Sequence, residues 1–100
     1  MNPTRIKLER KKGWRKPANT VVVSRPTKWG NPFQVAEYAG AIDPNALAVA
    51  AYKKWIFEPP QDELREQMVR ELRGKNLACW CRYNQACHAD VMLEIANAPN

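Results

Sequence analysis

The chain has 100 residues, of which 45% are hydrophobic and 26% are charged. This is enough for one domain with a modest core, and it argues against a disordered chain. No apolar run approaches the roughly 20 residues that cross a bilayer, and the basic N-terminus lacks the apolar stretch of a signal peptide. We therefore expect a single domain over residues 1–100, with the basic segment 1–19 partly in loop, no membrane partner and a cytoplasmic location.

The net charge of +6 is concentrated in the first part of the chain. Residues 1–30 contain nine Lys and Arg and one acid, Glu9, which gives +8, whereas the remaining residues hold seven bases and nine acids, which gives −2. Such a patch attracts polyanions, namely nucleic acid, nucleotide phosphates or an acidic protein surface. The same pattern is equally typical of a solvated basic arm, so charge alone does not decide between binding and solubility.

All three cysteines lie between Cys79 and Cys87. A secreted protein held together by disulfides would distribute an even number of cysteines along its chain. Free thiols in a reducing compartment are the simpler interpretation, and this agrees with the cytoplasm.

Two short strands are predicted in the first third of the chain. Residues 5–9 alternate between charged and apolar side chains, a period of two that indicates a half-buried strand. Residues 10–19 are basic and typical of a loop, and the β-branched run over residues 20–24 indicates a buried strand. The next segment, SRPTKWGNPF at residues 24–33, contains two prolines, a glycine and an asparagine, which exclude a regular element.

Two helices are predicted in the middle of the chain. Asp43 is a good N-cap and Pro44 suits the first helical position, so a helix begins there and ends before Pro59. Apolar residues at helical spacing predict its buried face, namely Leu47, Ala48, Ala51, Tyr52 and Trp55. A second helix begins near residues 61–62 and ends at Gly74. Its inward residues are expected to be Leu64, Met68, Val69 and Leu72.

A third strand, NLACW at residues 76–80, precedes a final helix that begins at Cys87 or His88. The helices between the second and third strands form a crossover, so these two strands are expected to be parallel. We therefore predict an α/β fold, a small two-layer or three-layer domain with a short, mainly parallel sheet of about three strands and three helices. Since open α/β sheets bind ligands at the carboxyl ends of their strands, segments 24–33 and 81–88 are expected to share one site.

Three stretches of the chain carry a family resemblance: KGWRKP, VVVSRPTKWGNPF and GKNLACWCRYNQACHADVMLEIAN. In this order and spacing, from Arg5 to about Asn97, they resemble a family of small bacterial and phage proteins known as domain of unknown function 4326. The resemblance implies a compact α/β domain that is often carried by phages, with the host cytoplasm as the expected location if this chain is phage-encoded. The family name gives no reaction, so function has to be argued from residues.

The segment 87–90 offers the parts of a thiol active site. Cys87 at the start of the last helix would meet unpaired backbone N–H groups and the helix dipole, which favour a thiolate. His88, the only histidine in the chain, would act as acid or base, and Asp90 would orient it or cap the helix. We predict these three as catalytic residues. The alternative is that the cysteines are structural and that His88 merely begins a helix.

Zinc is the alternative use of the same residues, with Cys79, Cys81, Cys87 and His88 as ligands. Structural zinc sites generally use two cysteines separated by two to four residues, whereas here one residue separates the first pair. Adjacent residues such as Cys87 and His88 also seldom reach one ion together. We therefore expect no metal or other cofactor, with zinc as the minority interpretation.

A phosphate-bearing ligand is expected at the loop 24–33 and the start of the last helix. Arginine binds phosphate through two N–H groups, glycine permits close backbone approach, and an aromatic ring stacks on a base. The residues expected to contact this ligand are Arg15, Arg25, Lys28, Trp29, Gly30 and Asn31. For Trp29 the alternative is a place in the hydrophobic core.

These observations favour a nucleotide- or nucleic-acid-directed protein, expected to be a small enzyme acting on a phosphate-bearing nucleotide or nucleoside derivative. A Cys/His site at the strand ends would carry the reaction. One alternative is a non-catalytic nucleic-acid-binding module with a structural Cys/His cluster. Another is a phage-type protein that binds and modulates a host protein. The sequence by itself leaves this choice open.

Overall fold

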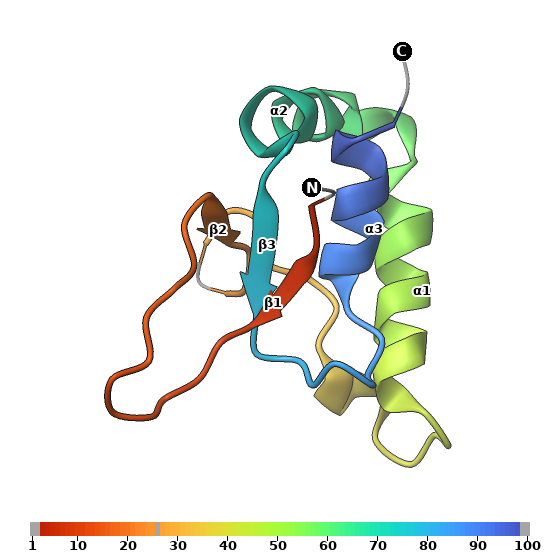
Figure 1. Ribbon diagram of the computed structural model, residues 1–100. Coiled ribbons are helices and arrows are strands. Elements are labelled where there is room, and N and C mark those ends of the chain that lie inside the picture. Colours follow the sequence, from red (N-terminus) through yellow and green to blue (C-terminus); the bar gives the residue numbers. More distant parts are fainter. Residues whose placement is uncertain (1–2, 26, 99–100) are drawn as a thin grey trace.

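The computed structural model describes residues 3–25 and 27–98, and its described part contains one three-stranded sheet and three α-helices (Figure 1). The strands are β1 (Arg5–Lys7), β2 (Thr20–Val22) and β3 (Asn76–Cys79). β3 lies in the centre and pairs in parallel with both neighbours, so the sheet order is β1-β3-β2. This confirms the predicted α/β class and the predicted parallel pairing of β2 with β3.

The three α-helices are α1 (Pro44–Ile56), α2 (Asp62–Leu72) and α3 (His88–Ala96). Two 3-10 turns, η1 (Val35–Tyr38) and η2 (Pro59–Gln61), precede α1 and α2. The carboxylate of Asp43 accepts a hydrogen bond from the Ala46 N–H at 3.1 Å, as its predicted N-cap role requires. α1 and α3 stand side by side along one side of the sheet, and α2 crosses near the end where β3 begins (Figure 1).

The hydrophobic core joins the central strand to the inner faces of the helices. Leu77, in β3, is fully buried, and Met68 of α2 and Met92 of α3 are fully buried with it. In α1 the buried stripe consists of Ala48, Tyr52 and Ile56. The prediction that Leu47 is part of this face is wrong, since Leu47 is 46% exposed. The buried stripe begins one position later, at Ala48, and one position turns the helix face by about 100°.

The strands end earlier than their apolar patterns predict, at residues 7, 22 and 79 instead of 9, 24 and 80. Hydrogen bonding nevertheless continues one residue further, because the Leu8 N–H donates to the Cys79 carbonyl and the Val23 N–H to the Ala78 carbonyl, both at 2.8 Å. After β2 and after β3 the chain leaves the sheet at the same edge, because the two strands are parallel. The two loops that carry the sequence motifs therefore start next to each other.

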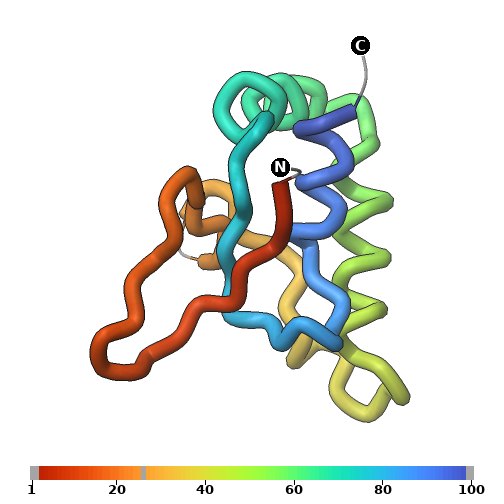
Figure 2. Tube along the Cα trace, in the orientation of Figure 1, coloured from red at the N-terminus to blue at the C-terminus, as the bar shows by residue number. Residues whose placement is uncertain are grey.

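Residues 8–19, between β1 and β2, form a long connection that extends away from the body of the protein (Figure 2). We call it the basic loop, since all its Lys and Arg side chains are exposed: Arg10, Lys11, Lys12, Arg15 and Lys16. Across residues 3–25 and 27–98, none of the helices has the length and apolar character that crossing a membrane requires.

Candidate functional site

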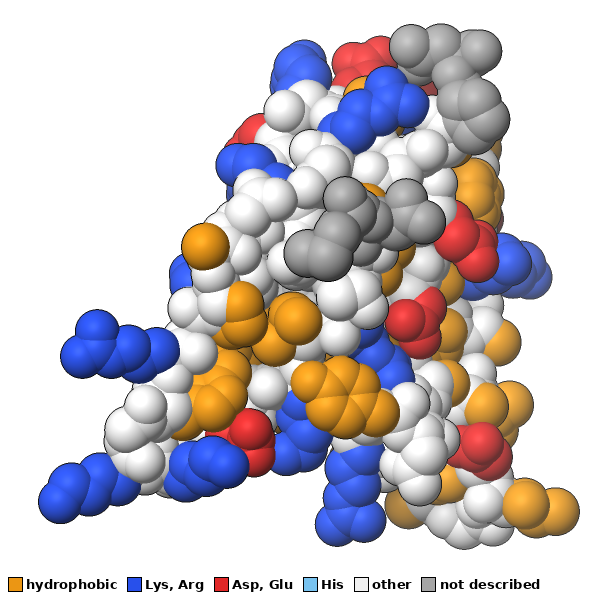
Figure 3. Space-filling view, viewed as in Figure 1, with side chains coloured by type: hydrophobic (Ala, Val, Ile, Leu, Met, Phe, Trp, Pro, Cys, Tyr) orange, Lys and Arg blue, Asp and Glu red, His pale blue; other side chains and the backbone are white. Residues whose placement is uncertain are grey.

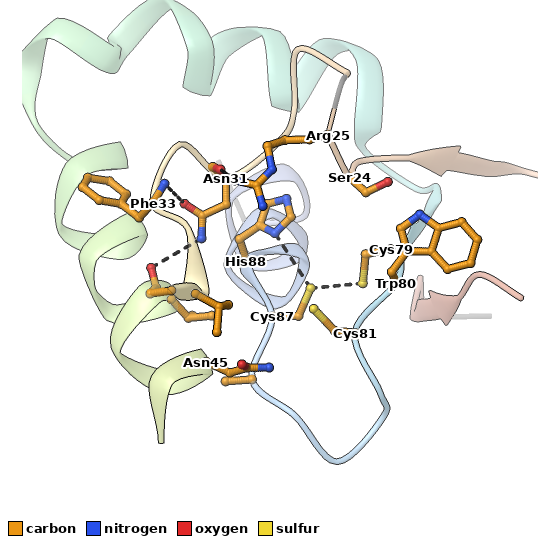
Figure 4. A pocket seen from close by; sticks show the side chains of 14 residues that line it. Ser24, Arg25, Asn31, Phe33, Asn45, Cys79, Trp80, Cys81, Cys87 and His88 are labelled. Atoms are coloured by element: carbon orange, nitrogen blue, oxygen red, sulfur yellow. Dashed lines mark hydrogen bonds between the residues drawn. The ribbon is translucent and has the colours of Figure 1, made fainter. Parts of the chain in front are cut away.

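A cavity of about 210 Å³ lies at the carboxyl ends of β2 and β3. Its walls come from the loop 24–33, from residues 79–88 and from the start of α1 (Figure 4). The prediction that the two loops meet at one edge of the sheet is thereby confirmed. The lining residues include Ser24, Arg25, Asn31, Phe33, Asn45, Trp80, Cys81 and His88.

Three thiols meet at one side of this cavity, and their side chains point toward one another (Figure 4). The Sγ atoms of Cys79, Cys81 and Cys87 all lie within 4.8 Å of one another. Those of Cys79 and Cys87 are 3.0 Å apart, in hydrogen-bond contact. Cys79 and Cys87 are each 1% exposed, whereas Cys81 is half-buried. We call these three residues the thiol cluster.

The thiols share their protons unequally. Hydrogen bonds from Cys79 and Cys87 lower the pKa of Cys81 to about 3, against the effect of burial, and the nearby Arg5 guanidinium lowers it as well. Hydrogen bonds with Cys81 and Cys87, together with burial, raise the pKa of Cys79. Within the cluster the lowered pKa therefore favours the thiolate on Cys81, which is half-buried, over the thiolate on Cys79, which is 1% exposed.

His88, the first residue of α3, is 7% exposed and held by backbone. Its Nε2 lies 2.9 Å from the Val23 carbonyl oxygen and 3.1 Å from that of Trp29. A carbonyl only accepts, so Nε2 carries a proton, which in the neutral ring leaves the lone pair on Nδ1. Nδ1 is 3.8 Å from the Cys87 Sγ. The structure therefore places Cys87 and His88 in contact, and their catalytic role stays a prediction.

Arg5 supports the site in a way that the sequence analysis missed. Its side chain is 9% exposed and donates to the carbonyl oxygens of Tyr83 and Gln85, each at 2.8 Å, and to that of Arg82 at 3.2 Å. The guanidinium thus fixes the loop that joins Cys81 to Cys87. Burial acts to lower the pKa of Arg5, but the charges of Asp90 and the thiols outweigh it and raise that pKa. No local pattern could identify this role, since Arg5 occupies an ordinary charged position of an alternating strand.

Asp90 is turned toward Arg5 rather than toward the cavity. Its Oδ2 lies 3.3 Å from the Arg5 Nη1, and its side chain is 52% exposed. Burial raises the pKa of Asp90, while Arg5 opposes this shift. The structure does not bring Asp90 to the imidazole of His88, whose two nitrogens face Val23, Trp29 and Cys87. Its place supports the loop through Arg5.

Two predicted ligand-binding residues, Arg25 and Asn31, do line the cavity. Arg25 is exposed, and its Nη1 donates to the Asn31 carbonyl at 3.2 Å. The Asn31 side chain ties the loop together, since its Oδ1 accepts from the Phe33 N–H at 2.8 Å. A Cβ at Gly30 would lie only 2.5 Å from the Arg25 Cγ, so glycine there makes room for Arg25 rather than for a ligand.

The other predicted ligand contacts lie elsewhere. Lys28 donates to the Glu71 carboxylate of α2 at 3.0 Å, and its Nζ is 4.7 Å from the centre of the Trp29 ring. Trp29 itself is 6% exposed and belongs to the core, which confirms the structural alternative for this residue. Arg15 is an exposed residue of the basic loop. None of these three lines the cavity.

Trp80 also lines the cavity. It is 45% exposed, and the Arg10 guanidinium carbon lies 4.9 Å from its ring centre. Figure 4 shows its indole pointing away from the thiol cluster. β3 ends at Cys79, one residue earlier than predicted, so Trp80 lies just outside the strand. Trp80 therefore connects the cavity to the basic loop.

Comparison with known proteins gives the family. The model of a family described as Domain of unknown function (DUF4326) matches residues 6–98. The chain belongs to this family. No curated protein and no solved structure matches the chain. The function therefore has to be inferred from the cavity and its residues.

Proposed function

We propose that this member of the DUF4326 family is a small enzyme that acts on a nucleotide or nucleoside derivative bound in the cavity. The reaction is a group transfer or hydrolysis at the thiol cluster, with His88 as the proton-transfer group. The observation that carries the proposal is the meeting of two chemically different walls in one cavity. One wall offers the exposed cation Arg25, and the other offers the thiol cluster and a histidine whose Nδ1 lies 3.8 Å from the Cys87 Sγ.

Arg25 is suited to hold a phosphate. Its guanidinium is exposed at the cavity, and it forms no ion pair with any carboxylate in the described part of the chain. A phosphate would therefore not have to displace a competing acid. Arginine also matches the phosphate geometry with two parallel N–H donors. Lys28, by contrast, is already paired with Glu71.

The size of the cavity supports a ligand of which only part is enclosed. Its volume of about 210 Å³ is below the roughly 300 Å³ at which sites begin to enclose drug-sized ligands. A nucleobase or a sugar fits such a space, with the remainder of the ligand at the open side. Trp80 is half-exposed there and offers a ring face on which a base stacks. The three free thiols also suit a reducing compartment, and on this basis we propose a cytoplasmic location.

Replacing Arg25 by alanine is expected to weaken binding of nucleoside 5′-monophosphates by roughly 10-fold to 100-fold, since a charged hydrogen-bond partner is removed. Titration calorimetry with ribonucleoside and deoxyribonucleoside monophosphates measures this. Lys28→Ala is the matched control, because it removes a positive charge from the same loop outside the cavity. Equal losses in both variants would mean that the ligand responds to overall charge, and the cavity assignment would then be wrong.

A second candidate function is supported by the basic loop. Five exposed Lys and Arg side chains lie on this one protruding segment, and blue side chains are prominent over it in the space-filling view (Figure 3). Through Arg10 and Trp80 the loop adjoins the cavity. A loop of this kind suits the backbone of a nucleic acid, in which case the nucleotide would be presented as part of a strand.

The salt dependence of binding separates these candidates. If the basic loop binds single-stranded nucleic acid, the triple variant Lys11→Gln, Lys12→Gln, Lys16→Gln should reduce the slope of log affinity against log salt by about 2, or roughly 0.7 per lost phosphate contact. Fluorescence anisotropy with labelled DNA and RNA oligonucleotides measures the slope. An unchanged slope would mean that these lysines do not contact the phosphates, and a free nucleotide in the cavity would then be the remaining candidate.

A further inference from the structure

We infer that the thiol cluster is a metal site and that it binds one zinc ion through the thiolates of Cys79, Cys81 and Cys87. This inference goes beyond the proposed function and does not rest on it, since it follows from the positions of the three sulfur atoms alone. The cysteines come from two segments, the end of β3 and the residue before α3. Their side chains nevertheless converge on one point (Figure 4).

The distances suit zinc. With Zn–S bonds of about 2.3 Å and tetrahedral angles, the sulfur atoms of a zinc site lie roughly 3.8 Å apart. The three Sγ atoms here lie within 4.8 Å of one another, and one pair is 3.0 Å apart. Small side-chain rotations bring such a triangle to the ideal spacing. Thiolates are soft ligands, which favour zinc over magnesium or calcium.

A metal accounts for the cluster better than ordinary burial does. A cysteine that only fills core space has apolar neighbours, whereas each of these thiols has two other thiols as neighbours. A single disulfide would use two of the sulfur atoms and leave the third beside them. A metal ion uses all three.

The charge around the cluster also suits a metal. Zinc with three thiolates carries one net negative charge, which is costly to bury without a partner. The Arg5 guanidinium supplies that partner, because its side chain is 9% exposed and its charge acts on the thiols. Arg5 also fixes the loop between Cys81 and Cys87, so it holds the second and third ligands at a constant separation.

The fourth coordination position opens to the cavity. His88 approaches only the Cys87 sulfur, and its Nε2 is anchored to the Val23 and Trp29 carbonyls, so its ring is held to one side of the cluster. Cys79, Cys81 and Cys87 all line the cavity. Zinc sites with three protein ligands and an open fourth position are the catalytic type, in which water or a substrate atom completes the coordination. The ligand class for this position is therefore water or an oxygen or nitrogen atom of the bound substrate.

The test is the metal content of the untagged full-length protein, purified with a reductant and without chelator, by mass spectrometry. We expect one zinc per chain. Replacement by Co²⁺ should give the charge-transfer absorption of cobalt–thiolate bonds, which needs no variant and so does not depend on the folding of a mutant. Cys81→Ser should weaken zinc binding by roughly 100-fold or more, since even the loss of an outer-shell partner costs 10-fold to 100-fold. Ser24 lines the same cavity but is not one of the proposed zinc ligands, so Ser24→Ala should bind zinc like the wild type.

Three results would overturn the inference. The first is wild-type protein that neither retains zinc nor shows cobalt–thiolate absorption when Co²⁺ is added. The second is a Cys79–Cys87 disulfide in protein handled under the same reducing conditions. The third is zinc binding that Cys81→Ser leaves unchanged. Because none of these measurements involves a nucleotide, failure of the nucleotide proposal would leave the zinc result intact, and the reverse also holds.

Discussion

Replacing Arg5 by methionine should destabilise the fold by about 3 kcal/mol, because several hydrogen bonds from one charged, largely buried donor are lost together. Three carbonyl oxygens, on Arg82, Tyr83 and Gln85, lose their donor in this variant, and the Asp90 carboxylate loses its cation. The methionine retains most of the apolar volume of the arginine stem, so lost packing contributes little. Chemical denaturation measures the change in the free energy of unfolding.

The matched control for Arg5 is Lys7→Met on the same strand. Residues two apart in a strand point to the same face, so both variants remove a positive charge from one face of β1. We expect the Lys7 variant to stay within about 0.5 kcal/mol of the wild type, as is usual for substitutions at positions without such partners. Equal stability of the two variants would mean that the loop 82–85 does not depend on the guanidinium.

A second measurement separates the effect of Arg5 on folding stability from its effect on the thiol cluster. If Arg5 holds the loop between Cys81 and Cys87, its loss should expose the thiol cluster. The thiols of the Arg5 variant should then react faster with a thiol reagent than those of wild type or Lys7→Met, under conditions where all three proteins are folded. A slower or unchanged reaction would assign Arg5 a role in stability alone.

The fold follows largely from signals that are local in the sequence. Asp43 and Pro44 mark the start of α1, Gly74 has the positive φ of +79° typical of the residue after a helix, and two helices between two strands require a crossover. The crossover also predicts that the two motif loops meet at one sheet edge, and the cavity is found there. Each of these inferences uses only the spacing of residues along the chain.

The site was harder to predict from the sequence, because its side chains have partners far along the chain. Arg5 bonds to residues 77 to 80 positions away, and His88 bonds to backbone 59 and 65 positions away. Lys28 was predicted to bind the ligand from its charge and its place in the loop 24–33. In the structure it pairs with Glu71 of α2 instead. Charge and spacing identify candidates, and only the packing of the helices decides which of them reach the cavity.

Two substitutions of His88 should separate its structural role from its chemical one. His88→Ala leaves the Val23 and Trp29 carbonyl oxygens buried without a donor, and this should cost about 2–3 kcal/mol of stability. His88→Gln places a side-chain N–H near the position of Nε2, so most of that stability should be retained. Glutamine offers no titrating nitrogen in place of Nδ1, so proton transfer should still be lost.

The expected result for His88→Gln is therefore a folded protein with the zinc content of the wild type and a rate of nucleotide turnover lower by about 10²–10⁴-fold, the usual contribution of a general acid or base. Turnover is followed by mass spectrometry of products formed from nucleoside monophosphates and from DNA and RNA oligonucleotides. A folded glutamine variant with the wild-type rate would remove His88 from the chemistry and leave it as the residue that fastens the loop 24–33 to α3. A loss of rate in the alanine variant alone would give the same conclusion, because the damage would then come from the freed carbonyls rather than from the missing Nδ1.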